Sequence, residues 1–275
     1  MGIKTPLNLD DINKALKDTI TFKNIKESTH GATDTVYFCD DKYVLKVYEQ
    51  SSKKQLSDEI KLHNYLKAYE NLKISKLYSY EIFQIKQKPC LLFEKTKGSV
   101  VQKVKKTHLE QIAKFLKLFH NKTKGFTNEN KNIFNKENLL NLINKTSSKD
   151  LLDIYSQIQI EENNDGLIHG DLFIDNAIFF EDKLNAVIDF NEACVGDYRF
   201  DLAVVVMSWC DFRKDKFLDE VNFLIENYGN CININSLLEY TKYACLYYMT
   251  TRKLVNRDFS DLMDKYIFLK DKLYE

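Results

Sequence analysis

The sequence predicts an α+β protein of two lobes, with a small antiparallel-sheet lobe over residues 1–95 and a mainly helical lobe over residues 96–275. The first lobe is indicated by two β-rich runs, at residues 35–39 and 43–48, which the turn pair Asp40-Asp41 separates as in a hairpin. The second lobe is indicated by apolar residues that recur at helical spacing. These segments are 109–121, 136–145, 149–160, 217–228 and 236–255.

Composition limits the classes of partner. The chain has 40 basic and 40 acidic residues and a net charge of zero, so we expect neither a nucleic acid nor an anionic membrane as a partner. Its six cysteines show no C-x-x-C spacing and several lie in apolar runs, which is typical of reduced core thiols in a cytoplasmic protein. The longest apolar stretch, residues 202–207, is far below the length of a membrane span. We therefore expect a soluble cytoplasmic protein, and its oligomeric state stays open.

Most of the chemical information lies in residues 166–201, which read GLIHGDLFIDNAIFFEDKLNAVIDFNEACVGDYRFD. Asp171 and Asn176 stand five residues apart in a predicted loop, and Asp189 follows an apolar run. If the runs AIFF and NAVI pair as strands, the hairpin returns Asp189 to the neighbourhood of Asn176. A carboxylate and an amide oxygen are suitable ligands for Mg²⁺ that also binds substrate phosphates.

This spacing matches that of protein kinases, in which the first Asp accepts the proton of the attacking hydroxyl while the Asn and the second Asp bind metal. The flanking letters differ, because HGD replaces H-R-D and DFN replaces D-F-G. The chain resembles the aminoglycoside phosphotransferase and choline kinase superfamily, which phosphorylates small-molecule hydroxyls on a protein-kinase-like fold. Within that superfamily it looks most like type II homoserine kinases, through GDLFIDN, IDFNEAC and FDLAVVVMSWC. The resemblance implies ATP and Mg²⁺ as cofactors, Asp171 as catalytic base, and Asn176 and Asp189 as metal ligands.

The same resemblance implies a nucleotide site in the first lobe. Lys46 lies in the run VLKVY, which resembles the strand whose Lys holds the α and β phosphates; the alternative is an edge-strand Lys that prevents aggregation. Glu59 lies in an amphipathic segment at residues 56–66, which Ser57 or Asp58 can cap. We expect Glu59 to pair with Lys46, as in the strand-to-helix ion pair of kinases, and the alternative is a solvated helix charge.

Two loops complete the expected nucleotide site. Residues 27–34 occupy the position of a phosphate loop but contain one glycine, so Ser28, Thr29 and Gly31 are the candidate phosphate contacts. The apolar run before Gly98 resembles the hinge between the lobes. There we expect backbone groups of Phe93 and Lys95 to bind adenine, although an ordinary strand end would look the same.

The resemblance also implies a small-molecule acceptor with a hydroxyl group, and homoserine or a similar amino alcohol is the first candidate. Arg252 ends the run CLYYMTTR, which resembles the ALRFWLSR stretch of homoserine kinases except that Tyr247 replaces its first Arg. Glu192 resembles the acidic position of aminoglycoside kinases and can meet a substrate amine; the alternative is a solvated loop carboxylate. An aminoglycoside or choline-like acceptor and a nucleotide-binding pseudokinase stay as alternatives.

Two further positions have structural interpretations. His120 closes a predicted helix, and we expect it to serve in packing. Asp201 begins the run DLAVVVMSW, where it can act as an N-cap or, by the same resemblance, steady the catalytic loop.

Overall fold

The computed structural model describes residues 5–28, 33–126 and 131–272. The chain divides into two compact units, the first formed by Met1–Gly98 with Asn185–Asn191 and the second by Ser99–Leu184 with Glu192–Glu275. The first unit holds a five-stranded antiparallel sheet, and the second holds most of the helices. The predicted α+β class is therefore confirmed. No helix in the described part of the chain is both long and apolar enough to cross a membrane.

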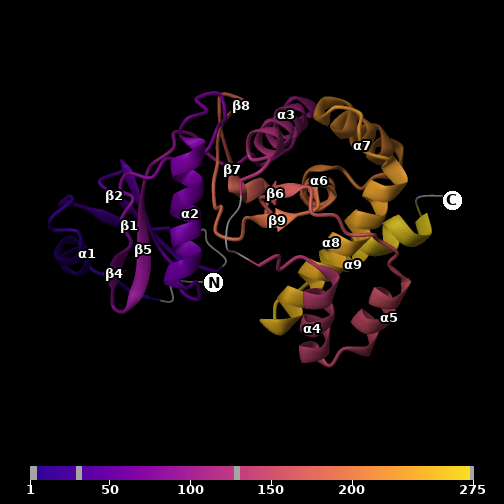
Figure 1. The fold of residues 1–275 in the computed structure, drawn as a ribbon, viewed down its shortest axis with the longest axis horizontal. Helices are drawn as coiled ribbons and strands as arrows, with labels where there is room; N and C mark the ends of the chain where they lie inside the picture. Colours follow the sequence, from indigo (N-terminus) through magenta and orange to yellow (C-terminus); the bar gives the residue numbers. More distant parts are fainter. Residues whose placement is uncertain (1–4, 29–32, 127–130, 273–275) are drawn as a thin grey trace. The chain divides into compact units, whose positions relative to one another are not determined.

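The sheet of the first unit has the strand order β1-β2-β3-β5-β4 (Figure 1). Its strands are β1 (Ile25–Glu27), β2 (Thr35–Cys39), β3 (Tyr43–Val47), β4 (Phe83–Ile85) and β5 (Lys88–Glu94). The predicted hairpin is present, since Thr35 pairs with Val47 and Cys39 with Tyr43. Both turn aspartates, Asp40 and Asp41, have positive φ, a conformation that Asp tolerates better than most residues.

Alternation along the strands divides this sheet into two packed faces. One face packs against α1 (Leu9–Ala15), with Leu45 and Leu92 in the same apolar cluster as Ile12. The other packs against α2 (Lys53–Leu66), with Leu91 and Phe93 in a cluster that contains Leu56. Figure 1 shows α1 and α2 on the two sides of the sheet. Lys46 follows Leu45 in β3, so its side chain lies on the face that packs against α2.

The start of α2 differs from the prediction. The helix begins at Lys53, and Ser52 rather than Ser57 or Asp58 is its N-cap. The Ser52 side chain accepts from the backbone of Gln55, whose own side chain accepts from the Ser52 N–H at 2.9 Å. This capping box satisfies two N–H groups at once, which explains why the helix starts earlier.

The segment Asn185–Asn191 clusters with the first unit although the sequence places it in the helical lobe. Its anchor is Val187, whose backbone oxygen accepts from Ser75 N–H and whose N–H donates to the Lys73 oxygen, both at 2.9 Å. Asp189, two residues later, is thereby a residue of the first unit.

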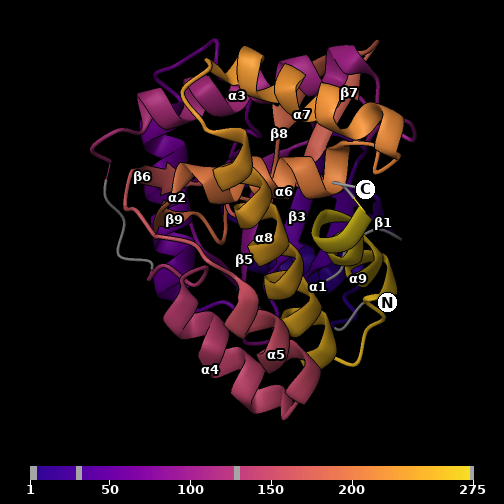
Figure 2. The ribbon, with the colours of Figure 1, turned by 90° about the vertical axis from the view of Figure 1, so that its right-hand side faces the viewer.

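The second unit is built on the buried helix α6 (Tyr198–Trp209), which packs against α3, α8 and the strand β6 (Figure 2). All five predicted helical segments are present. The helices of this unit are α3 (Lys106–Lys122), α4 (Lys136–Thr146), α5 (Lys149–Gln157), α6, α7 (Lys214–Tyr228), α8 (Ile234–Leu254) and α9 (Ser260–Ile267). Two short sheets join β6 (Gly166–Ile168) to β9 (Cys194–Gly196) and β7 (Ala177–Phe180) to β8 (Lys183–Val187). The helices α1 and α9 were not predicted.

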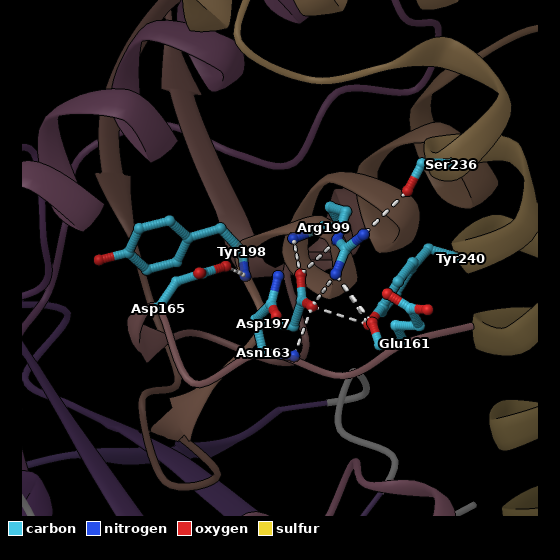
Figure 3. Close-up of polar contacts among 8 residues, drawn as sticks. All are labelled: Glu161, Asn163, Asp165, Asp197, Tyr198, Arg199, Ser236 and Tyr240. Atoms are coloured by element: carbon cyan, nitrogen blue, oxygen red, sulfur yellow. Dashed lines mark hydrogen bonds and ion pairs between the residues drawn. The ribbon is translucent and has the colours of Figure 1, made fainter.

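A polar network fixes the start of α6 (Figure 3). Asp197, not Asp201, is the N-cap, and its Oδ1 accepts from the Arg199 N–H at 2.9 Å. Its Oδ2 accepts from Arg199 Nη2 at 2.6 Å and from the Tyr240 hydroxyl at 2.7 Å. The expectation that Asp201 caps this helix is wrong, because the chain enters the helix one turn earlier.

The same network joins α6 to the extended segment before β6. Arg199 Nη2 donates to the Glu161 carbonyl oxygen at 2.8 Å, and the Tyr240 hydroxyl oxygen lies 2.7 Å from the same oxygen. The guanidinium also lies over the Tyr240 ring, 4.5 Å from its centroid. These contacts come from three separate parts of the chain, so they fix the position of Asp201 one turn into the helix.

Candidate active site

The Asp201 side chain fixes the loop that carries Asp171 through hydrogen bonds to its backbone. The Asp201 side chain is fully buried, and it accepts backbone hydrogen bonds from His169 at 2.8 Å and from Gly170 at 2.7 Å. A buried carboxylate that accepts two backbone N–H groups fixes the path of the chain at those residues. The expectation that Asp201 steadies this loop is confirmed.

Asp201 is in turn held by His120, which does more than pack. The buried His120 ring places Nε2 at 2.9 Å from Asp201 Oδ2 and Nδ1 at 2.8 Å from the Tyr228 hydroxyl, and it stacks on Tyr198. Burial by itself would raise the pKa of Asp201, but the bonds from His120 and Gly170 hold it below its ordinary value. Asp201 therefore stays ionised as an acceptor for the loop.

Gly170 is a position where the loop needs glycine. Its φ is +82°, in the left-handed region, and an added Cβ would lie 2.2 Å from the Phe134 ring. A larger residue would strain the backbone and displace Phe134, and Asp171 directly follows.

Asn176 orients the carboxylate of Asp171. Asn176 closes a short 3₁₀ turn, Ile174–Asn176, and its Nδ2 donates to the Asp171 carbonyl at 2.7 Å and to Oδ2 at 3.0 Å. Because both bonds use the amide nitrogen, the amide oxygen of Asn176 is directed away from Asp171. This oxygen is the atom that can serve as a metal ligand.

Tyr248 in α8 meets the other oxygen of Asp171. Its hydroxyl is 2.5 Å from the Gly170 carbonyl oxygen and 3.1 Å from Asp171 Oδ1. Burial and the charge of Asp171 raise the pKa of Tyr248 well above its ordinary value, so the phenol stays protonated and can donate. Sequence reasoning missed this residue, and its only signal was the second Tyr of the run CLYYMTTR.

In the first unit, Lys46 is buried between two carboxylates. Its Nζ is 2.7 Å from Asp189 Oδ1 and 3.2 Å from Asp34 Oδ2, and it lies 4.5 Å from the centroid of the Tyr48 ring. Burial alone would lower the pKa of Lys46, but Asp189, Asp34 and Glu59 raise it above its ordinary value. The interpretation of Lys46 as an edge-strand Lys is wrong, because β3 lies between β2 and β5 and the side chain is buried.

Glu59 does not pair with Lys46, contrary to our expectation. Its Oε2 accepts from the Tyr48 hydroxyl at 2.8 Å, while its Oε1 is buried without a hydrogen bond and lies 4.0 Å from His63 Nε2. Burial raises the pKa of Glu59 to about 7 and lowers that of His63 to about 4. The alternative of a solvated helix charge is also wrong, since Glu59 is 2% exposed.

The candidate adenine and phosphate loops agree with the structure only in part. Ser28 directly follows β1 and its N–H donates to the Val36 oxygen, whereas Thr29 and Gly31 lie outside the described residues. Phe93 lies inside β5, paired with Val44. The N–H of Lys95 donates to the Lys42 oxygen at 2.8 Å, and the adenine contacts expected from the backbones of Phe93 and Lys95 stay predictions.

The candidate acceptor residues lie in the second unit. Arg252 forms an ion pair with Asp261 at 2.6 Å, and Glu192 is exposed. Burial is the main cause that raises the pKa of Tyr247 and of Tyr248, and the charge of Glu192 adds to it in both cases.

Comparison with solved structures identifies the fold of this protein. It is similar to an aminoglycoside 2'-phosphotransferase in a GDP complex, with a TM-score of 0.68 at 14% identity over 96% of this chain and 97% of the other. It is also similar to the choline kinase of Streptococcus pneumoniae, with a TM-score of 0.69 at 14% identity over 96% of this chain and 97% of the other. The fold is therefore the kinase-like fold of small-molecule phosphotransferases, as predicted.

Sequence comparison gives the family. The model described as the phosphotransferase enzyme family matches residues 24–226, and the chain belongs to this family. Among curated proteins, the homoserine kinase of Zymomonas mobilis is 26% identical over an alignment of 254 positions. The alignment covers 83% of this chain and 79% of that protein. The homoserine kinase of Rhizobium rhizogenes is 23% identical over 237 residues, covering 78% and 74% of the two chains. The prediction of a phosphotransferase is confirmed.

Proposed function

We propose that this protein is an ATP-dependent kinase that transfers the γ-phosphate to the hydroxyl of a small amino alcohol, with homoserine as the first candidate. The observation that carries the proposal is the carboxylate of Asp171, which Asn176 and Tyr248 contact at separate oxygens in a chain of the phosphotransferase enzyme family. A base with a fixed orientation is what in-line attack by a hydroxyl requires.

In the proposed reaction, Asp171 takes the proton of the acceptor hydroxyl as the oxygen–phosphorus bond forms. The bond between the γ-phosphorus and the β,γ-bridging oxygen breaks, and its electron pair leaves with ADP. Because phosphoryl transfer needs little covalent help from the protein, most of the rate would come from position and charge neutralisation.

Lys46 is the proposed contact for the ATP phosphates. It is a buried cation whose partners in this structure are carboxylates, and phosphate oxygens are chemically equivalent partners. We propose that ATP phosphates take the place of Asp34 beside the Lys46 ammonium, while Asp189 keeps its contact. Ser28, Thr29 and Gly31 stay predicted phosphate contacts, and Phe93 and Lys95 stay predicted adenine contacts. Glu59 is proposed to act on Lys46 through its charge and without a direct ion pair.

Asn176 and Asp189 are the proposed ligands of Mg²⁺. The donor set fits this ion, because Mg²⁺ prefers oxygen and is commonly bound by one or two protein ligands together with substrate phosphates and waters. The directed amide oxygen of Asn176 and the Asp189 carboxylate are of that kind. No group of three acidic, His or Cys side chains that could hold a metal ion occurs among the described residues. When bound, Mg²⁺ would neutralise negative charge on the phosphates.

For the acceptor, the homoserine kinases named above support an amino acid with a hydroxyl group. Glu192 would bind its ammonium group and Arg252 its carboxylate. A second candidate, an aminoglycoside or choline-like cation, is favoured by the engagement of Arg252 with Asp261 and by Tyr247 in place of a second Arg.

The test is Mg²⁺-dependent ADP release from ATP with a panel of L-homoserine, choline, ethanolamine, several aminoglycosides and no acceptor. Stimulation by homoserine supports the first candidate, and stimulation by choline or aminoglycosides supports the second. ATP binding without any acceptor-dependent turnover would contradict both candidates and favour a nucleotide-binding pseudokinase. Repeating the assay with GTP gives the nucleotide preference.

A further inference from the structure

Asp171 has a neighbour that neither the kinase motifs nor the proposed mechanism uses. Tyr248 lies in the middle of α8, and its hydroxyl reaches the loop of Asp171 across 77 positions of the chain. The helix is well anchored, because it packs against α6 and α4. A residue on such a helix holds its hydroxyl in one place and can act as a fixed reference for the loop.

The Tyr248 ring is itself fixed by aromatic neighbours. It meets the Phe173 ring edge to face, with centroids 4.7 Å apart at 87°, and the Tyr247 ring at 5.3 Å and 81°. Such contacts allow a phenol little freedom apart from rotation of its O–H. The position of the hydroxyl oxygen is thus set by packing, while its proton can turn.

The hydroxyl has two acceptors and one proton. The Gly170 carbonyl oxygen is 2.5 Å away and Asp171 Oδ1 is 3.1 Å away. A phenol can donate to one acceptor at a time and can accept through its own lone pairs. When Asp171 is ionised, the Tyr248 O–H can donate to Oδ1 of Asp171. When Asp171 carries the proton taken from the acceptor, the Tyr248 O–H can turn to the Gly170 carbonyl oxygen. A lone pair of the Tyr248 oxygen can then accept a hydrogen bond from protonated Asp171.

We propose that Tyr248 is a positioning residue for the phosphoryl transfer, which holds Oδ1 of Asp171 in the orientation that receives the acceptor's proton. The proposal rests on the proposed role of Asp171 as the base. Asn176 holds Oδ2 and Tyr248 holds Oδ1, so the two contacts together fix the plane of the carboxylate. The proton passes from the acceptor hydroxyl to Asp171, and the protonation state of Tyr248 does not change.

The variant that tests this is Tyr248→Phe, because it removes one oxygen and keeps the packed ring. Its matched control is Tyr243→Phe in the same helix, whose buried hydroxyl donates to the Phe134 carbonyl oxygen at 2.7 Å. Each substitution removes one buried hydroxyl and the hydrogen bond that it donates, so the two should lower the melting temperature by similar amounts.

In the ADP-release assay we expect Tyr248→Phe to lower kcat about tenfold or more, with the KM for ATP within about twofold of the wild type. Tyr243→Phe should keep kcat close to wild type. A loss that comes only from a weakened fold would appear equally in both variants. Equal kcat values for the two variants would overturn the proposal.

A double-mutant cycle shows whether Tyr248 acts through Asp171. In the Asp171→Asn background, Tyr248→Phe should cause little further loss, because the group that it orients is no longer a base. Losses that multiply in the double variant would mean that Tyr248 acts elsewhere, and the proposal would be wrong.

Crystal structures of the wild type, Tyr248→Phe and Tyr243→Phe give a readout that needs no acceptor. We expect Asp171 to adopt a second rotamer in Tyr248→Phe alone, and an unchanged rotamer in that variant would contradict the proposal. If the wild type shows no acceptor-dependent turnover with the panel, the proposed function fails, and the crystallographic result still decides whether Tyr248 orients Asp171.

Discussion

The backbone N–H of Gly170 donates to a carboxylate oxygen of Asp201 at 2.7 Å, and this contact joins the loop of Asp171 to the buried helix α6. The second oxygen of Asp201 accepts a hydrogen bond from the backbone N–H of His169 and contacts Nε2 of the His120 ring. One fully buried carboxylate therefore supports the proposed catalytic loop from a helix that is anchored by Asp197 and Arg199.

Asp201→Asn should lower the free energy of unfolding by about 2–4 kcal/mol, because an amide has one acceptor oxygen for three buried donors. Urea denaturation measures the change. The control is Asp219→Asn at an exposed position of α7, for which we expect a change within about 0.5 kcal/mol. Equal stabilities of the two variants would show that the Asp201 contacts do not support the fold.

Asp201 also predicts how stability depends on pH. Its pKa in the folded protein lies below the value of 3.8 expected in the unfolded chain. Its contribution is therefore present above about pH 4 and is lost as the pH falls through the folded pKa. The acid-induced loss of stability should be shallower in Asp201→Asn than in the wild type, which unfolding curves between about pH 2 and 5 would measure.

Asp171→Asn should lower kcat by about 10² to 10⁴-fold and leave the melting temperature almost unchanged, because it removes the proton acceptor and keeps the shape of the side chain. Steady-state ADP release with the best acceptor of the panel measures this. Asp175→Asn is the control, since it makes the same change at an exposed position of the same loop. Near-full turnover of Asp171→Asn would mean that Asp171 is not the base.

The sequence predicts those parts of the site that are short-range. Two examples are the turn between β2 and β3 and the contact between Asp171 and Asn176. Each depends on the conformational preferences of a few residues that are adjacent in the sequence. The structure brings Asn176 to Asp171 through a single 3₁₀ turn, so five positions of sequence are sufficient to predict the contact.

Contacts between distant positions leave no such pattern. His120 meets Asp201 across 81 positions, and Tyr248 reaches Asp171 across 77, because the packing of α3, α6 and α8 brings them together. In the same way, the helical period predicts α2 but not which of its residues reaches Lys46. Glu59 accepts a hydrogen bond from Tyr48, which directly follows β3, and Lys46 forms an ion pair with Asp34. No spacing rule for kinases indicates either contact.

Lys46→Met should raise the KM for ATP at least tenfold or abolish turnover, since it removes the proposed phosphate contact. It should also lower stability, because Asp34 and Asp189 both lose their ion pair with the Lys46 ammonium. The double variant Lys46→Met with Asp34→Asn separates the two effects. It should recover much of the melting temperature and none of the ATP affinity, whereas recovered ATP binding would place the phosphates on another cation.

Glu59→Gln should become more stable relative to the wild type as the pH rises. Burial raises the pKa of Glu59 from 4.5 to about 7 in the folded protein, so between these values the folded state holds a proton that the unfolded chain has released. The wild type therefore loses stability from Glu59 across this range, by up to about 3 kcal/mol at pH 8, and a glutamine has no proton to lose.

His63 acts in the opposite direction, because its folded pKa of about 4 lies below its ordinary value of 6.5 and its neutral form is lost on acidification. The difference between variant and wild type removes the His63 contribution, since both proteins contain it. Urea denaturation at pH 5 and pH 8 should show a larger difference at pH 8. The same difference at both pH values would mean that Glu59 is already ionised in the folded protein at pH 5, with Lys46 as the cation close enough to keep it so.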